Sequence, residues 1–179
     1  MIATGLLLGN LGKPAQAMEA GTKLGRETGL PLPRFVSFKR NSVNLRVGPG
    51  RKYGIKWHYR RRGLPVEVVQ EFDRWRRVRD AEGTTGWVLH SLLSSRRTAI
   101  VAPWDQPDAT EGQVVKASFL DGKGSASRKA STVAKPQAGL QVNVKECDGR
   151  WCAVEVRGTG FWLEQEKLWG VYPGEAITD

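Results

Sequence analysis

The residue types that carry most nucleophilic chemistry are scarce in this chain. Its 179 residues include two cysteines, Cys147 and Cys152, and two histidines, His58 and His90. A reactive cysteine needs a base beside it, but both histidines fall within short strand-like stretches of the first half of the chain, and neither has a recognisable catalytic context. The sequence therefore predicts no cysteine-histidine catalysis.

Other catalytic and cofactor signatures are equally weak. Glu164 and Glu166 lie near a turn beside Lys167, which is more typical of a solvated face than of a glycosidase carboxylate pair. No glycine-rich phosphate loop precedes a helix, and two cysteines without further ligands are poor evidence for zinc, which takes four donors. We therefore expect a protein that is not an enzyme and binds neither a cofactor nor a metal.

The two cysteines flank the turn dipeptide 148–149, Asp-Gly. Pairing Val144 with Val154 across this turn leaves Cys147 one position out of register with Cys152, and a bulge in the turn would bring the sulfurs together. In an oxidising compartment this favours a disulfide. The alternative is a pair of buried thiols.

The N-terminus favours export. Residues 2–11 form a short apolar run, and 15–17, Ala-Gln-Ala, provide the small residues that a signal peptidase accepts, which predicts cleavage after Ala17. The positively charged segment that usually opens a signal peptide is missing. No stretch reaches the roughly 20 apolar residues of a membrane-spanning helix. Residues 1–17 are thus a predicted signal peptide of a periplasmic or otherwise exported protein, and 18–34 a predicted linker.

Short strand-like runs separated by turn residues predict an all-β fold. In the strongest predicted hairpin, Val66, Val68 and Phe72 alternate onto one face, which we expect to be core. Glu67, Glu71, Arg77 and Arg79 then fall on the opposite, wet face.

The hairpin recurs 76 residues later. The matches, without a gap, are Val66, Val68, Trp75 and Val78 with Val142, Val144, Trp151 and Val154, and 86–87 then match 160–161 after a two-residue deletion. This predicts two repeats with a boundary near 97–100. A unit of about 60 residues is marginal alone, so we expect the two to pack together.

The first repeat resembles a bacterial Src-homology-3 domain. The resemblance rests on 43–50, VNLRVGPG, followed by Trp75 and by 86–88, GWV. It implies two small SH3-like β-barrels in tandem, at 35–97 and, in degenerate form, at 98–172, with a C-terminal tail at 173–179. It also implies an accessory module that binds cell-wall (peptidoglycan) peptide or an envelope protein, usually without catalysis.

Candidate ligand-binding residues all lie in the first repeat. Residues 34–97 hold 16 Lys and Arg against 5 Asp and Glu, a net charge of +11, which favours anionic partners or serves only solubility. The candidates are loop residues, aromatic residues beside cations and an arginine cluster: Asn44, Arg46, Tyr53, Trp57, Tyr59, Arg60, Arg61 and Arg62. Trp57 and Tyr59 share a face, as a ligand surface or as a cap on the core, whereas Trp75 and Trp87 are expected in the core.

Two other functions compete with wall binding. One is a periplasmic scaffold that holds a protein complex. The other is a basic barrel that binds nucleic acid through arginines and interleaved aromatic residues. Export and the acidic second half make nucleic acid the less favoured partner.

Overall fold

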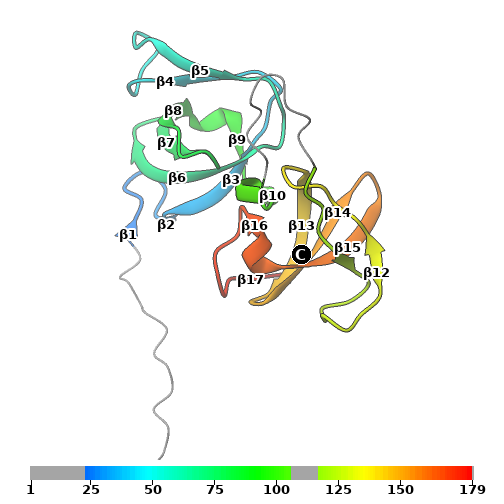
Figure 1. Ribbon diagram of the computed structural model, residues 1–179. Coiled ribbons are helices and arrows are strands. Elements are labelled where there is room, and N and C mark those ends of the chain that lie inside the picture. The colour runs from blue at the N-terminus through cyan, green and yellow to red at the C-terminus, as the bar shows by residue number, and fades with distance from the viewer. Residues whose placement is uncertain (1–22, 106–116, 179) are drawn as a thin grey trace, which may run out of the picture.

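The computed structural model describes residues 23–105 and 117–178, which form one large antiparallel β sheet for each repeat and a separate two-stranded sheet near the N-terminus (Figure 1). The first sheet contains β3 (Arg34–Phe38), β4 (Val43–Arg46), β5 (Ile55–Tyr59), β6 (Pro65–Phe72), β7 (Trp75–Arg79), β8 (Thr85–Leu89) and β9 (Leu93–Ser94). The second contains β10 (Thr98–Val101), β11 (Gly122–Lys123), β12 (Thr132–Ala134), β13 (Gln141–Asp148), β14 (Trp151–Val156), β15 (Thr159–Glu164), β16 (Leu168–Trp169) and β17 (Ala176–Ile177). The predicted signal peptide, 1–17, lies outside the described residues.

Helical structure in the described ranges is limited to three short 3-10 turns. These are η1 (His90–Leu92), η2 (Pro103–Asp105) and η3 (Gln165–Lys167). The predicted all-β fold is confirmed. Among the residues placed by the structure, no helix has the length and apolar character needed to cross a membrane.

The two sheets follow the same path. The strand order is β5-β4-β8-β7-β6-β3-β9 in the first and β12-β11-β15-β14-β13-β10-β16 in the second. The matched valines Val68 and Val78 are 0% exposed, and their counterparts Val144 and Val154 are buried as well. The internal repeat expected from valine spacing is therefore present in strand topology and in core packing.

A bulge in β6 overturns the predicted alternation. The register with β7 shifts between Val68 and Gln70, after which Glu71 pairs with Arg76. One extra residue moves every later side chain to the opposite face. Phe72, expected in the core, is 55% exposed, whereas Glu71, expected in water, is buried.

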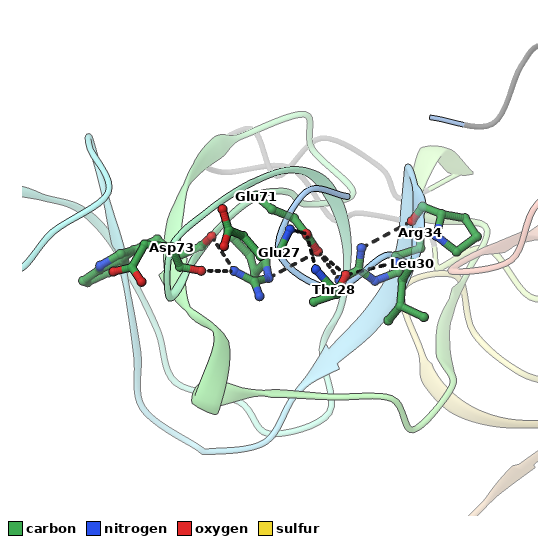
Figure 2. A network of polar contacts seen from close by, with 9 residues as sticks. Glu27, Thr28, Leu30, Arg34, Glu71 and Asp73 are labelled. Carbon is green, nitrogen blue, oxygen red and sulfur yellow. Dashed lines mark hydrogen bonds and ion pairs between the residues drawn. The ribbon is translucent and has the colours of Figure 1, made fainter. Parts of the chain in front are cut away.

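Residues 23–34, expected as part of a linker, instead begin with a hairpin of β1 (Lys23–Leu24) and β2 (Pro31–Leu32). Its turn contacts the first sheet through the Glu71 carboxylate, which accepts hydrogen bonds from the backbone N–H groups of Glu27 (3.0 Å) and Thr28 (3.1 Å) and from the Thr28 hydroxyl (2.7 Å) (Figure 2). The hairpin is ordered because a buried carboxylate satisfies its turn.

Two arginines complete this network. Arg34 donates to Glu71 Oε1 at 2.8 Å, and Arg76 Nε lies 3.4 Å from the same oxygen. Burial alone would raise the pKa of the Glu71 carboxyl, but the hydrogen bonds from Thr28 and Arg34, with the backbone N–H groups, lower the pKa from 4.5 to about 2. The Glu71 carboxylate therefore remains ionised at neutral pH although it is buried.

The second repeat has a bulge at the matching position. The register of β13 with β14 shifts between Val144 and Glu146, which places Cys147 directly opposite Cys152. The predicted disulfide between them is confirmed, with Cα atoms 4.1 Å apart. The bulge that aligns the cysteines lies before them rather than in the turn, where the sequence placed it.

The expected C-terminal tail, 173–179, also joins the fold in its described part. β17 pairs with β13 through Cys147 with Ile177. Glu175 forms an ion pair with Arg97 at 2.7 Å. Pairing with β13 and the ion pair with Arg97 thus fix residues 175–177, which were expected to form part of a C-terminal tail.

The repeats exchange large and small residues at one core contact. Arg77 pairs with Trp87 and Ala153 with Trp162, so the structural counterpart of Trp87 is Trp162 rather than Phe161, as sequence matching suggested. In this register Gly86 corresponds to Phe161 and Leu45 corresponds to Gly122, so the large and the small residue change places between the repeats. A Cβ at Gly86 would lie 2.5 Å from Leu45 Cγ, and a Cβ at Gly122 would lie 2.7 Å from the Phe161 ring.

The two repeats contact each other through aromatic rings. The Phe35 ring of β3 lies 5.1 Å from the Trp169 ring and 4.7 Å from the Tyr172 ring, centroid to centroid. The Tyr172 hydroxyl donates to Glu67 Oε1 at 2.9 Å, and burial together with this carboxylate raises the pKa of Tyr172. Glu67, expected in water, is therefore buried at the junction, and the repeats pack together.

Candidate functional site

Asn44 and Arg46, the candidates on β4, hold local structure. Arg46 donates to the backbone carbonyls of Arg51 (3.2 Å) and Tyr53 (2.7 Å), and so closes the loop between β4 and β5. Asn44 Oδ1 lies 2.5 Å from His58 Nδ1 on the neighbouring strand. These contacts agree with a role in fixing the loop. Arg46 is also the strand partner of Trp87.

Tyr53 and Gly48 explain why this loop contains glycine. The Tyr53 ring packs over Gly48 so closely that a Cβ there would lie 2.6 Å from the ring. Lys52 Nζ lies 5.5 Å from the ring centroid, a cation-π contact. Tyr53 is 38% exposed, so it is positioned mainly by the loop and is accessible at its edge.

Tyr59 is removed from the candidate surface by burial. Its hydroxyl donates to Asp80 Oδ2 at 2.6 Å, and its ring packs 4.9 Å from that of Phe38. Burial, followed by the contact with Asp80, raises the pKa of Tyr59. Of the two expected roles, Tyr59 therefore caps the core.

Trp57 lies on the same side of the β4–β5 hairpin as Tyr59 but is 58% exposed, and its strand, β5, is at the edge of the first sheet. Its cross-strand partner is the buried Leu45. Trp57 is thus exposed to solvent whereas Tyr59 is buried in the core, so the two rings do not form one ligand surface.

The arginines of 60–62 are exposed, and Arg62 lies at the junction of the repeats. The backbone carbonyl of Arg62 accepts a hydrogen bond from Gln141 Nε2 at 3.3 Å, and its backbone N–H donates to Asn41. The cluster thus directly follows the buried Tyr59, and its last residue contacts the second repeat through its backbone.

The structure places another group of aromatic residues together on the outer side of the first sheet. Directly paired residues share a face, and the pairs Phe72 with Trp75, Arg77 with Trp87, and Arg46 with Trp87 define it. The Phe72 and Trp87 rings meet edge to face at 6.5 Å. We call this surface, made of Phe72, Trp75, Trp87, Arg46 and Arg77, the aromatic face.

Sequence reasoning missed the aromatic face because it assigned Phe72, Trp75 and Trp87 to the core. Trp75 and Trp87 are half-buried and belong to neither core cluster. Only the bulge after Val68 explains the position of Phe72. A signal was present in Arg77, whose charge marks the same side of β7 as Trp75.

A groove of about 490 Å³ continues from the aromatic face toward the β4–β5 hairpin. Its lining includes Trp87, Arg77, Lys56 and the 63% exposed Val47. Lys56 Nζ donates to the Thr85 carbonyl at 3.0 Å, which fixes one wall. Flat rings flanked by cations and a narrow groove suit an extended chain that carries negative charge.

Ser42, His58 and Asn44 form a second polar arrangement on β4 and β5. Ser42 Oγ lies 3.2 Å from His58 Nε2, and His58 Nδ1 faces Asn44. The order of hydroxyl, imidazole and amide is that of a nucleophile, a base and an orienting group. Ser42 and His58 are exposed, however, and water weakens the electrostatic stabilisation on which such chemistry depends.

The corresponding surface of the second repeat is chemically different. Trp151 and Trp162 take the places of Trp75 and Trp87, but Asp148 replaces Phe72 and Ala153 replaces Arg77. A groove of about 600 Å³ beside Trp151 is lined by both acids and arginines. Among the described residues, the second repeat therefore has no counterpart of the exposed Phe72 ring on this surface, although Lys123 pairs with Trp162 as Arg46 pairs with Trp87.

Comparison with known proteins gives the following matches. A putative N-acetylmuramoyl-L-alanine amidase, YrvJ, of Bacillus subtilis (strain 168) is 25% identical over 132 residues, which are 70% of this chain and 25% of that protein. The chain thus spans about a quarter of the relative's length. The solved structures NlpC2 and NlpC1 from Trichomonas vaginalis are 12% and 13% identical, with TM-scores of 0.32 and 0.30. They match 76% and 81% of this chain and 48% of each of theirs.

The family comparison covers both repeats. The bacterial SH3 domain profile matches residues 39–95 and 125–170, one segment in each sheet. Together these segments exceed half of the chain. The tandem arrangement inferred from the valine spacing is thus found independently by the profile, and the protein belongs to the bacterial SH3 domain family.

Proposed function

We propose that this protein is an exported, non-catalytic binding protein whose aromatic face recognises peptide of the bacterial cell wall. The observation that carries the proposal is the 55% exposed Phe72 ring in edge-to-face contact with the half-buried Trp87, whose strand partner is Arg77. Monomeric proteins seldom expose contiguous apolar surface without a binding role. The neighbouring cations select an acidic chain over a neutral one.

Three further observations support the wall as the ligand's source. The family is bacterial, and the relative's name is that of a putative amidase acting on muramoyl-alanine. This chain corresponds to only a quarter of that protein, which suits an accessory module. The disulfide and the signal-like residues 1–17 favour an oxidising compartment outside the cytoplasm.

Cosedimentation with purified peptidoglycan sacculi at physiological salt tests this function. Phe72→Ser should weaken binding at least fivefold, roughly 1 kcal/mol of lost aromatic contact. Trp57→Ser is the matched control, because Trp57 is equally exposed but lies on the other side of its hairpin. Equal losses in both variants would contradict the assignment to the aromatic face.

Charge reversal of Arg60 and Arg61 separates a shaped site from general attraction. The aromatic face contains none of these residues, so we expect at most a small loss of sacculus binding at physiological salt. Complete loss would reduce the interaction to nonspecific charge. An absence of binding by the parent protein would favour the scaffold function, in which the ligand is an envelope protein.

Export has its own test. The secreted protein should begin at Met18, and its intact mass should be lower by two hydrogen atoms than that of the reduced chain. A cytoplasmic product that starts at Met1 with free thiols would contradict the proposed location.

The arrangement of Ser42, His58 and Asn44 favours a second candidate, a serine hydrolase. A fluorophosphonate probe would label Ser42 if the imidazole activated it. We expect no labelling above that of Ser42→Ala. Labelling that disappears in this variant would overturn the non-catalytic proposal.

A further inference from the structure

A cavity of about 250 Å³ lies between the two repeats, away from the aromatic face. Its walls come from both sheets and from the segment that joins them: Ser37, Phe38, Lys39, Arg62, Gly63, Ser94, Arg96, Thr98, Gln141 and Asn143. Domain junctions are common places for small-ligand sites. We call this space the junction cavity.

The junction cavity carries charge of one sign. Lys39, Arg62 and Arg96 line it, and its lining contains no acidic residue. Within the described ranges, none of these three side chains forms an ion pair. Like charges around one cavity repel each other, so an anion in it would stabilise the junction.

The backbone that carries the cations is fixed while their side chains remain available. The Arg96 carbonyl accepts a hydrogen bond from Ser37 Oγ at 2.8 Å, and the Arg62 carbonyl accepts one from Gln141 Nε2 at 3.3 Å. The side chains of Arg62 and Arg96 are not used in these contacts. The exposed guanidinium groups can therefore turn toward a carboxylate without a change of backbone, although ordering their side chains has an entropic cost.

Two polar groups of the wall have no partner among the described residues. They are Thr98 Oγ1 and Gln141 Oε1, both buried. An unpaired buried polar group costs about 1–3 kcal/mol, and both can accept a hydrogen bond. A ligand that carries an N–H group beside its negative charge could donate to one of these acceptors once the acceptor's side chain turns toward the cavity.

We propose that the junction cavity binds the free carboxylate terminus of a peptide. Lys39, Arg62 and Arg96 receive the carboxylate, and the adjacent peptide N–H faces the acceptors of Thr98 and Gln141. Inorganic phosphate at neutral pH carries its O–H donor on the charged group itself, whereas a peptide terminus carries its N–H donor apart from the carboxylate, as the separate cations and acceptors of the cavity require. Only the source of the peptide, the cell wall, rests on the proposed function.

Isothermal titration of the whole protein with acetyl-alanyl-alanine at physiological salt tests the proposal. The peptide acid should bind, and its C-terminal amide should bind at least tenfold more weakly. Arg62→Gln and Arg96→Gln should each weaken binding of the acid about tenfold. Arg60→Gln, an exposed neighbour that does not line the cavity, should leave the affinity within about twofold.

Several results would overturn the proposal. They are absence of binding by the peptide acid, equal binding of acid and amide, tighter binding of inorganic phosphate, and equal effects of Arg60→Gln and Arg62→Gln. Phe72→Ser should not change this titration, because Phe72 does not line the cavity. Loss of sacculus binding in that variant with a normal titration therefore distinguishes the two sites.

Discussion

The two repeats fill the same structural position with different chemistry. After matching bulges in β6 and β13, the first repeat pairs Glu71 with Arg76, and the second, 76 residues later, pairs Cys147 with Cys152. An ion pair and a disulfide therefore occupy equivalent cross-strand sites. In each repeat a terminal segment is anchored there.

The difference shows how each pair organises its surroundings. The Glu71 carboxylate has spare acceptor capacity, and it uses that capacity on Thr28 and Arg34, so that distant residues are joined in one network. The disulfide has no such capacity, and the second repeat instead attaches β17 through strand pairing at Cys147. The stability of the ion pair depends on several partners and on pH, whereas that of the disulfide depends on the redox state.

Removal of the Glu71 carboxylate should have the largest effect. Glu71→Ala leaves the buried Arg76 side chain, 7% exposed, without its anion, and should lower the free energy of unfolding of the first repeat by about 3–5 kcal/mol. Urea unfolding followed by tryptophan fluorescence measures this. Glu27→Ala is the control, since Glu27 contributes only its backbone N–H to the network. Similar losses in both variants would contradict the role of the buried carboxylate.

Acid should weaken the first repeat selectively. The pKa of Glu71 falls from 4.5 to about 2 on folding, so the unfolded chain binds the proton more readily. The stabilisation, about 3 kcal/mol, is complete above pH 4.5 and is lost as pH falls toward 2. Unfolding measured from pH 6 to 2 in Glu71→Gln should lack this component. An unchanged pH profile in that variant would assign the acid sensitivity to other groups.

Opening the disulfide should have a smaller effect, confined to the second repeat. The closed loop is short, since Cys147 and Cys152 are five positions apart, and its chain-entropy contribution is about 2 kcal/mol. Cys147→Ser with Cys152→Ser should lower the stability of the second repeat by this amount. Hydrogen exchange of β6 and β7 should stay unchanged, and faster exchange there would show that the repeats unfold together.

Transplanting the disulfide sharpens the comparison further. Glu71→Cys with Arg76→Cys places two thiols at the register position that bridges Cys147 and Cys152, so the oxidised protein should contain a second disulfide by mass spectrometry. Its oxidation should recover about 2 kcal/mol. The hairpin at 23–32 should nevertheless become sensitive to protease, because no carboxylate holds its turn. Continued protection would show that strand packing alone anchors the hairpin.

The smallest effect expected is at the contact between repeats. Tyr172→Phe removes the hydroxyl that donates to Glu67 at 2.9 Å but keeps the ring beside Phe35. We expect a loss of about 1 kcal/mol, since Arg79 still pairs with Glu67. Thermal unfolding should show the two transitions moving apart. A single unchanged transition would mean that ring packing alone couples the repeats.

Much of the architecture was predictable from the sequence. Valine spacing and turn residues identified the all-β fold and the repeat, because both depend on local periodicity and on matches at a fixed distance. The disulfide followed from the Asp148-Gly149 turn between two cysteines. These features need no knowledge of distant contacts.

The place of Phe72 on the aromatic face was not predictable, because it depends on a single inserted residue. Val69 looks like any other strand residue, yet the bulge there reverses the sides of Glu71 and Phe72. The burial of Tyr59 depends on Asp80, which is remote in sequence. The fixed conformation of residues 23–34 likewise depends on contacts with Glu71. The alternation pattern placed Glu71 on the exposed face, so its burial could not be expected.

In the first repeat Leu45 packs on Gly86, and in the second Phe161 packs on Gly122, so the large residue is on the other strand. This difference affects how the chain avoids folding incorrectly. Tandem domains of one topology can exchange strands during synthesis, and the product traps both copies. If β4 paired with β15, Leu45 would meet Phe161 in the space that a glycine occupies. If β11 paired with β8, two glycines would face each other and leave a void. The exchanged sizes therefore disfavour pairing between strands of different repeats, through steric overlap in one case and a void in the other.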